Sequence, residues 1–134
     1  LIPHRYPFLL IDKVIDIVEN QSATGIKNVT VNEPYFTGHF PSSPVVPGVL
    51  QIESMAQTAA VLVAKSLNVS DSTALVLLTT IDKAKFRKPV VPGDVMLLAI
   101  SVQKMRNNLW KFKGEVIVDS QKVSECEFSA MMRI

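Results

Sequence analysis

Residues 48–67 read GVLQIESMAQTAAVLVAKSL, and this stretch decides the fold class. It contains no proline and four alanines, which favours an α-helix. Apolar residues fall on every side of that helix, and its only charged residues are Glu53 near the start and Lys65 near the end. A helix that is hydrophobic all round is a buried helix. The sequence therefore predicts one central helix, about 30 Å long, with the rest of the chain built around it.

The segment before this helix is rich in proline. Four of the chain's eight prolines lie between positions 34 and 47. Because each proline removes a backbone donor and restricts its own φ angle, the segment can form neither a helix nor a central strand. We expect a long, stiff, ordered loop. Long loops within compact domains frequently carry function, so functional residues are sought here.

Most of the remaining chain reads as β-strands. Apolar runs and alternating patterns predict five of them, at 9–19, 24–31, 95–102, 110–118 and 124–134. One buried helix with five or six mainly antiparallel strands is an α+β layout in which a sheet wraps the helix. We expect a single domain over residues 1–134. A helix of this length is hard to cover with one small sheet, so a second copy of the chain is expected to complete the core.

Composition excludes several classes of protein. The chain has 134 residues, of which 48% are hydrophobic and 19% charged, so a disordered chain is excluded. A formal net charge of +2 is too small to indicate a nucleic-acid binder. The single cysteine, Cys126, rules out an internal disulfide and a zinc site built of cysteines. Even the longest apolar stretches, such as residues 59–64, are far shorter than the ~20 residues of a membrane span.

These features predict a cytoplasmic protein. No signal peptide is visible, and the chain begins at Leu1 rather than at a methionine. A plastid-type organelle is therefore the alternative, should a targeting segment precede Leu1.

Two residues in the middle of the chain could carry acid–base chemistry. His39 lies in the proline-rich loop, within GHFP at 38–41, and Glu53 lies fourteen residues later in the first turns of the helix. Each residue also has a structural explanation. A loop histidine can bind the backbone, and a carboxylate near a helix N-terminus interacts favourably with the helix dipole.

The start of the helix could supply a third chemical element. Pro47-Gly48-Val49 opens the helix, where backbone N–H groups have no intrahelical acceptor. Gly48 lets a ligand approach the backbone closely. Free N–H donors at the positive end of a helix dipole can stabilise a carbonyl oxygen that becomes an enolate. An imidazole base, this oxyanion site and a carboxylic acid are the three parts that an α,β-elimination of water needs.

Five segments carry a resemblance to a known family: HRYPFLLID at 4–12, GHFP at 38–41, PVVPGVL at 44–50, ESMAQ at 53–57 and KFRKPVVPGD at 85–94. Together they resemble the FabZ-type (3R)-hydroxyacyl-acyl carrier protein dehydratases, from Leu1 almost to the C-terminus. The resemblance implies a hot-dog fold, in which an antiparallel sheet wraps around one long helix. It also implies a homodimer as the working unit, commonly assembled into a homohexamer, a trimer of dimers.

The resemblance further implies an activity: dehydration of (3R)-hydroxyacyl-acyl carrier protein to trans-2-enoyl-acyl carrier protein in type II fatty acid biosynthesis, without a cofactor. By position, His39 matches the family's catalytic histidine and Glu53 its catalytic glutamate, one from each subunit of the dimer. Gly48 matches the glycine whose N–H contacts the thioester carbonyl, and Val49 and Phe86 are further expected substrate contacts. The related FabA-type enzymes carry aspartate where Glu53 stands, so glutamate favours dehydration without isomerisation. A metal is not expected, because His39 and Glu53 lack a third ligand.

Charge is unevenly distributed along the chain. Residues 82–113 contain eight basic and two acidic residues, whereas the remainder contains six basic and ten acidic ones. Lysines on strand edges can serve only to prevent aggregation. Alternatively, a basic patch steers an acidic partner toward the protein. The partner implied by the resemblance is acyl carrier protein, which is strongly acidic and delivers its substrate on a phosphopantetheine arm, with Lys85, Arg87 and Lys88 as the expected contacts.

The remaining motif residues are expected to be structural. His4, Arg5 and Tyr6 are expected to seal the N-terminal segment onto the body of the protein. On the helix, Ile52 and Met55 either line an apolar acyl pocket or pack in the core.

Two alternative functions stay open. An acyl thioesterase on the same fold would use a carboxylate to activate water and would release a free thiol. A non-catalytic acyl-binding module would produce no absorbance change from enoyl formation, even with saturating substrate.

Overall fold

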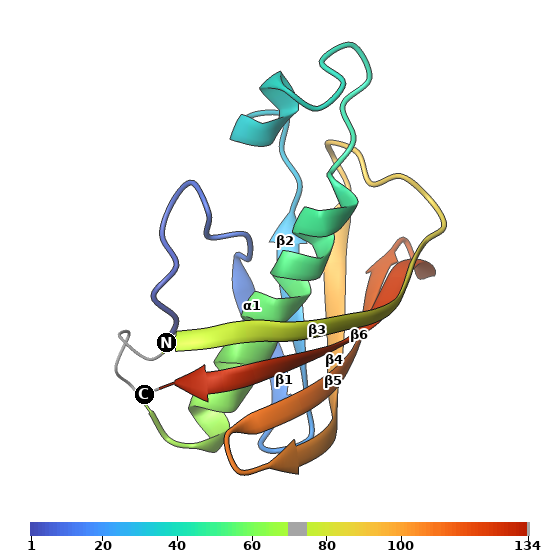
Figure 1. Cartoon of the computed structure of the whole chain (residues 1–134). Coiled ribbons are helices and arrows are strands. Elements are labelled where there is room, and N and C mark those ends of the chain that lie inside the picture. The colour runs from blue at the N-terminus through green and yellow to red at the C-terminus, as the bar shows by residue number, and fades with distance from the viewer. Residues whose placement is uncertain (70–74, 134) are drawn as a thin grey trace.

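The computed structural model describes residues 1–69 and 75–133, in which one long helix lies against a curved antiparallel sheet (Figure 1). In chain order the elements are β1 (Lys13–Val18), β2 (Ser22–Asn28), the 3₁₀-helix η1 (Pro34–Thr37), α1 (Gly48–Ser66), β3 (Leu75–Phe86), β4 (Val95–Arg106), β5 (Leu109–Val118) and β6 (Gln121–Arg133). The strand order is β1-β2-β4-β5-β6-β3, and each neighbouring pair is antiparallel. This arrangement is the hot-dog fold, and it confirms the predicted α+β class.

The hydrophobic core lies between α1 and the sheet. On α1, Met55, Ala59 and Leu62 have no exposed surface, and their spacing of four and three places them on one face of the helix. On the sheet, the rings of Phe112 and Phe128 are fully buried and stack with their centroids 5.2 Å apart. Twelve of the nineteen residues of α1 are buried, which confirms that this helix is central.

Two glycines in the sheet allow the strands to approach α1 closely. A Cβ at Gly25 in β2 would lie 2.1 Å from Oγ1 of Thr58 on the helix. A Cβ at Gly114 in β5 would lie 2.6 Å from Sδ of Met55. Any side chain at these positions would force the sheet and the helix apart, so the two glycines set how tightly the sheet wraps α1.

The observed elements differ from the predicted ones mainly at their ends. The helix ends at Ser66, one residue before the predicted end. Residues 9–12, predicted as strand, belong instead to the N-terminal segment that precedes β1. The proline-rich loop contains one short ordered element, η1. The last predicted strand residue, Ile134, lies outside the described residues.

The apolar pattern of the sequence does not predict β3. This strand lies at the edge of the sheet and, among the described residues, pairs only with β6. Its residues from Leu77 to Phe86 are exposed, and its register with β6 shifts twice. An edge strand that is covered on neither face does not need an alternating apolar pattern, so its sequence carries only a weak strand signal.

Replacing Gly25 by alanine should lower the free energy of unfolding by about 1–3 kcal/mol, because the added methyl group clashes with Thr58. Urea denaturation measures this loss. Gly38→Ala is the matched control, since a Cβ there would meet no atom within 4 Å. The double variant Gly25→Ala/Thr58→Ala should regain most of the stability of Thr58→Ala alone. Wild-type stability of Gly25→Ala would contradict the close approach.

Candidate active site

The loop before α1 holds His39 in one orientation. The backbone N–H groups of Gly38 and His39 both donate to the carbonyl oxygen of Tyr35, at 3.2 and 3.1 Å. The ring nitrogen Nδ1 of His39 lies 2.6 Å from the carbonyl oxygen of Val45. Because a carbonyl can only accept, Nδ1 carries the hydrogen of the neutral ring and Nε2 keeps its lone pair. The contact with the backbone therefore leaves the Nε2 lone pair of His39 free to accept a proton.

A largely buried ion pair anchors this loop to the sheet. Nζ of Lys27 on β2 lies 3.0 Å from Oε2 of Glu33, and the two side chains are only 10% and 13% exposed. Glu33 also accepts hydrogen bonds from the backbone N–H and the hydroxyl of Thr30, at 3.3 and 3.2 Å. Burial and the nearby Glu33 carboxylate raise the pKa of Tyr35 above its ordinary value, so its phenol stays neutral. η1 begins directly after Glu33 and is therefore fixed by charge as well as by packing.

A pocket of about 500 Å³ lies between this loop, the start of α1 and the end of β3. Gly48 and Val49 are the first residues of α1, so their N–H groups have no acceptor within the helix. The Phe86 ring lies so close that a Cβ at Gly48 would be 2.8 Å from it. The pocket thus combines an imidazole with a free lone pair, free N–H donors and apolar walls. Its lining includes six residues predicted for the site, namely His39, Gly48, Val49, Phe86, Arg87 and Lys88.

Glu53 lies in a different pocket of the same chain. That pocket has a volume of about 220 Å³ and is bounded by the N-terminal segment, α1 and residues 76–78 of β3. Glu53 follows Gly48 by five residues, which is about 140° of rotation around a regular helix. The two residues therefore face different sides of α1. Within one chain, the structure does not bring His39 and Glu53 into a common cavity.

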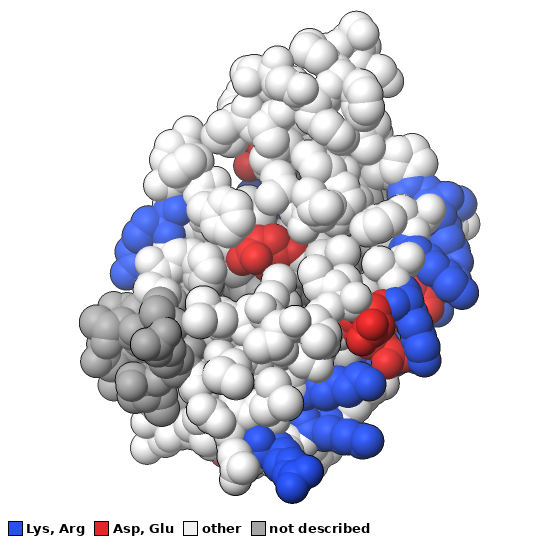
Figure 2. Space-filling model, in the orientation of Figure 1, with Lys and Arg blue, Asp and Glu red and all other residues white. Residues whose placement is uncertain are grey.

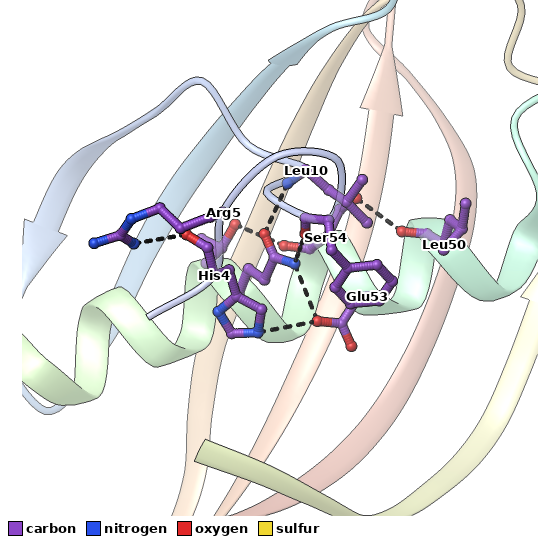
Figure 3. A network of polar contacts seen from close by, with 9 residues as sticks. His4, Arg5, Leu10, Leu50, Glu53 and Ser54 are labelled. Carbon is purple, nitrogen blue, oxygen red and sulfur yellow. Dashed lines mark hydrogen bonds and ion pairs between the residues drawn. The ribbon is translucent and has the colours of Figure 1, made fainter. Parts of the chain in front are cut away.

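A network of polar contacts surrounds the Glu53 carboxylate (Figure 3). The side chain of Gln57 is buried, and its Nε2 donates to Oε2 of Glu53 at 3.1 Å and to the carbonyl oxygen of Phe8 at 2.8 Å. Its Oε1 accepts a hydrogen bond from the backbone N–H of Leu10 at 2.9 Å. Nε2 of His4 lies 3.5 Å from the same Glu53 oxygen. The N-terminal segment is therefore tied to α1 directly beside the carboxylate.

The sequence does not predict the contact between His4 and Glu53, because from the sequence His4 is expected only to seal the N-terminal segment. Forty-nine residues separate the two side chains, so no local pattern connects them. Two features of the sequence could have pointed to His4 as a functional residue: it is one of only two histidines, and it lies in the HRYP segment.

Basic side chains gather along one flank of the molecule (Figure 2). Arg87 pairs with Glu125 on β6, and the Lys88 ammonium donates to the side-chain oxygen of Gln121. Lys85 does not line the His39 pocket. It lines a separate pocket of about 210 Å³ together with two further lysines, two glutamates and Cys126. Two of the three predicted partner contacts thus lie in the wall of the His39 pocket.

Other reactive groups do not form a second centre within residues 1–69 and 75–133. Among these residues no cluster of three or more metal-ligating side chains occurs. Burial, and to a smaller extent Glu125 and Glu127, raise the pKa of the Cys126 thiol to about 11, so it is not a thiolate at neutral pH. No helix in the described part of the chain has both the length and the apolar character needed to cross a membrane.

Comparison with known proteins identifies relatives over nearly the whole chain. A family model described as a FabA-like domain matches residues 2–127. A protein of Cereibacter sphaeroides strain ATCC 17025, named 3-hydroxyacyl-acyl-carrier-protein dehydratase FabZ, is 58% identical over 134 residues, which cover 100% of this chain and 86% of that protein. A protein of the same name from Paramagnetospirillum magneticum is 54% identical over 132 residues, covering 98% of this chain and 82% of that protein.

Solved structures share the fold at much lower sequence identity. The dehydratase heterocomplex ApeI:P from Xenorhabdus doucetiae matches with a TM-score of 0.84 and 18% identity, covering 99% of this chain and 88% of that chain. The TT0310 protein from Thermus thermophilus matches with a TM-score of 0.67 and 13% identity, covering 98% of this chain and 100% of that chain. These likenesses concern the fold alone.

Replacing Glu33 by alanine should lower the free energy of unfolding by about 3 kcal/mol, because Lys27 then keeps a buried charge without a partner. Chemical denaturation measures the change. The double variant Lys27→Met/Glu33→Leu should restore most of the loss, since an apolar pair replaces the buried ions. Glu115→Ala, which removes a partner of the exposed Lys122, is the control with an expected effect below about 1 kcal/mol. Equal losses for Glu33→Ala and Glu115→Ala would refute the anchoring role.

Proposed function

The chain belongs to the FabA-like family and, within it, to the FabZ-type dehydratases, and on this premise we propose that it converts (3R)-hydroxyacyl-acyl carrier protein to the trans-2-enoyl product in type II fatty acid biosynthesis. One observation supports specific residues for this reaction. The bare Nε2 of His39 and the free N–H groups at the start of α1 line the same apolar pocket. A base beside an oxyanion site is the arrangement that proton removal next to a thioester carbonyl requires.

The proposed elimination proceeds by acid–base chemistry alone. Nε2 of His39 removes the proton from the α-carbon, while the N–H of Gly48 stabilises the negative charge that develops on the thioester oxygen. The electron pair of the C–H bond forms the Cα–Cβ double bond, and the bond from Cβ to the hydroxyl oxygen breaks. Glu53 donates its proton to that oxygen, and water leaves. All electrons stay in the substrate and in water, so the reaction needs no cofactor.

The acid and the base are proposed to meet between two copies of the chain. One end of β3, at Val76–Leu78, borders the Glu53 pocket, and its other end, at Phe86, borders the His39 pocket. In a two-fold symmetric dimer whose β3 edges run antiparallel, the Phe86 end of one strand lies beside the Leu77 end of the other. Each His39 pocket would then face the partner's Glu53, and one dimer would contain two complete sites.

The exposed surface around β3 supports this dimer. β3 is an edge strand, and an unpaired edge of this length readily accepts another strand. Leu77, Ile81 and Phe86 on β3 are 45%, 48% and 50% exposed, and Val49 at the start of α1 is 73% exposed. Burying these apolar side chains would stabilise the assembly. We also propose a trimer of such dimers as the larger assembly and the cytoplasm as the compartment.

Acyl carrier protein is the proposed partner that delivers the substrate. Arg87 and Lys88 line the His39 pocket, where a phosphopantetheine arm would enter, and Lys85 adds positive charge near the end of β3, just before them. Arg87 is 43% exposed even though it pairs with Glu125. A basic surface at the pocket would attract an acidic carrier protein and speed its encounter.

His39→Ala should abolish the elimination, and Glu53→Gln should reduce it severely, with folding kept in both. Mixing the two inactive variants provides the sharper test. Random pairing places half of the subunits in mixed dimers, and each mixed dimer contains one intact site. About a quarter of the wild-type rate should therefore return if the site lies between subunits. Hydration of a crotonyl thioester, followed by the loss of enoyl absorbance, measures the rate.

Matched controls for this experiment are each variant unfolded and refolded alone, which should stay inactive. Near-normal turnover by either variant alone would contradict the assigned roles. A mixture that forms mixed dimers but stays inactive would contradict the shared site. Release of a free thiol from the crotonyl thioester, without formation of the hydroxyacyl thioester, would instead indicate the thioesterase.

The triple variant Lys85→Ala/Arg87→Ala/Lys88→Ala should lower kcat/KM for carrier-linked substrate about ten-fold at low salt, because it removes the charge that steers the carrier protein. Its rate should also depend less on salt. The measurement compares carrier-linked with carrier-free thioester, and the ratio of the two rates should fall. Lys104→Ala/Arg106→Ala, at the far end of β4, is the matched control and should keep the wild-type ratio. An unchanged ratio in the triple variant would rule out this docking surface.

A further inference from the structure

We infer that His4 is a positioning residue of the proposed dehydratase site. His4 and Gln57 both contact Oε2 of Glu53, so the proton that Glu53 transfers is carried by its other oxygen, Oε1. This inference rests on the proposed function and assigns a residue and a single oxygen atom within it. Three observations carry it, namely the contacts of the carboxylate, the surroundings of the His4 ring and the docking of the N-terminal segment.

Both neighbouring side chains contact the same carboxylate oxygen. Nε2 of Gln57 lies 3.1 Å from Oε2 of Glu53, and Nε2 of His4 lies 3.5 Å from it. Figure 3 shows both dashed lines ending on one oxygen of Glu53, while the other oxygen points away from the two donors. An oxygen that already accepts one hydrogen bond and faces a second N–H donor is the poorer place for a proton. In the acid form of Glu53 the O–H is therefore on Oε1.

The surroundings of the His4 ring determine which nitrogen donates. Nδ1 of His4 is buried and has no hydrogen-bond partner among the described residues. Protonation at Nδ1, in the other neutral tautomer or in the imidazolium, would bury an N–H without an acceptor, which is costly. The neutral tautomer with hydrogen on Nε2 avoids this cost and directs its N–H at Glu53. The distance of 3.5 Å is longer than a normal hydrogen bond, as such contacts often are before substrate binds.

The N-terminal segment is held in the position that this contact requires. Gln57 binds the backbone of Phe8 and Leu10, and Arg5 donates to the carbonyl oxygens of Ile2 and His4 at 2.9 and 2.7 Å. The residue that orients Glu53 from α1 therefore also docks the segment that carries His4. Arg5 braces this segment without touching Glu53, which separates a structural contribution of the segment from a specific contribution of the imidazole.

The test compares two substitutions at His4 with one at Arg5. His4→Leu removes the donor and should lower kcat about 10- to 100-fold with KM unchanged, because the acid is no longer held in its productive orientation. His4→Gln places an amide nitrogen where Nε2 of the ring stood and should recover most of kcat. Arg5→Met, the matched control, should keep the wild-type kcat even if it lowers the melting temperature.

Each outcome of these assays decides the inference. Wild-type kcat in His4→Leu would overturn it, and so would a His4→Gln variant no faster than His4→Leu. Equal losses in Arg5→Met and His4→Leu would assign the effect to docking of the segment and would also overturn it. None of these results affects wild-type turnover or the recovery of activity on mixing, so the proposed function would survive them. A wild-type protein without dehydratase activity would overturn both.

A second measurement uses the unaltered protein and does not depend on any variant folding. The chain contains only two histidines, and the structure assigns them opposite neutral tautomers. Nδ1 of His39 faces the carbonyl oxygen of Val45 at 2.6 Å, whereas Nε2 of His4 faces Oε2 of Glu53 at 3.5 Å. Nitrogen-15 chemical shifts of histidine-labelled protein near pH 8 should therefore show one ring of each tautomer. Two rings with hydrogen on Nδ1 would overturn the role of His4.

Discussion

The burial of α1 is the constraint on which the rest of the structure depends. A helix with no polar face exposes apolar surface unless other elements enclose it. Gly25 and Gly114 let the sheet approach the helix more closely than any side chain would allow. One chain covers the helix only in part, since Val49 at its start and the edge strand β3 keep exposed apolar side chains. The same demand for burial that shapes the monomer therefore favours a second copy.

Helix geometry then distributes the chemistry over two faces. The N–H groups at the start of α1 open into the His39 pocket, while Glu53 faces another pocket about 140° away around the axis. A rigid helix cannot turn both groups toward one cavity. In the proposed dimer, the Glu53 pocket of one chain faces the His39 pocket of the other, so the site is complete only after the two chains have assembled. A subunit on its own would hold an acid and a base that cannot meet.

The need of buried polar groups for partners also orients the atoms that are proposed to react. The Val45 carbonyl accepts a hydrogen bond from Nδ1 of His39, so the lone pair on Nε2 stays free. The ion pair of Lys27 with Glu33 holds the loop that presents this histidine. On the other side of α1, Gln57 ties the N-terminal segment to the helix beside Glu53. In each case a hydrogen bond or ion pair that gives a buried polar group its partner also fixes the orientation of a neighbouring side chain.

The sequence by itself determined the buried helix and most of the sheet, because helix phase, strand alternation and proline placement act over a few neighbouring residues. It also predicted His39, Gly48 and Glu53 as candidate site residues, from their chemistry and from the family resemblance. Only the tertiary structure decided that β3 forms an edge, that His39 and Glu53 occupy separate pockets, and that His4 contacts Glu53. These features arise from contacts between distant segments. Gln57, for example, binds backbone atoms 49 and 47 residues away. Such contacts are selected by how the whole chain packs around α1, and no local pattern encodes that choice.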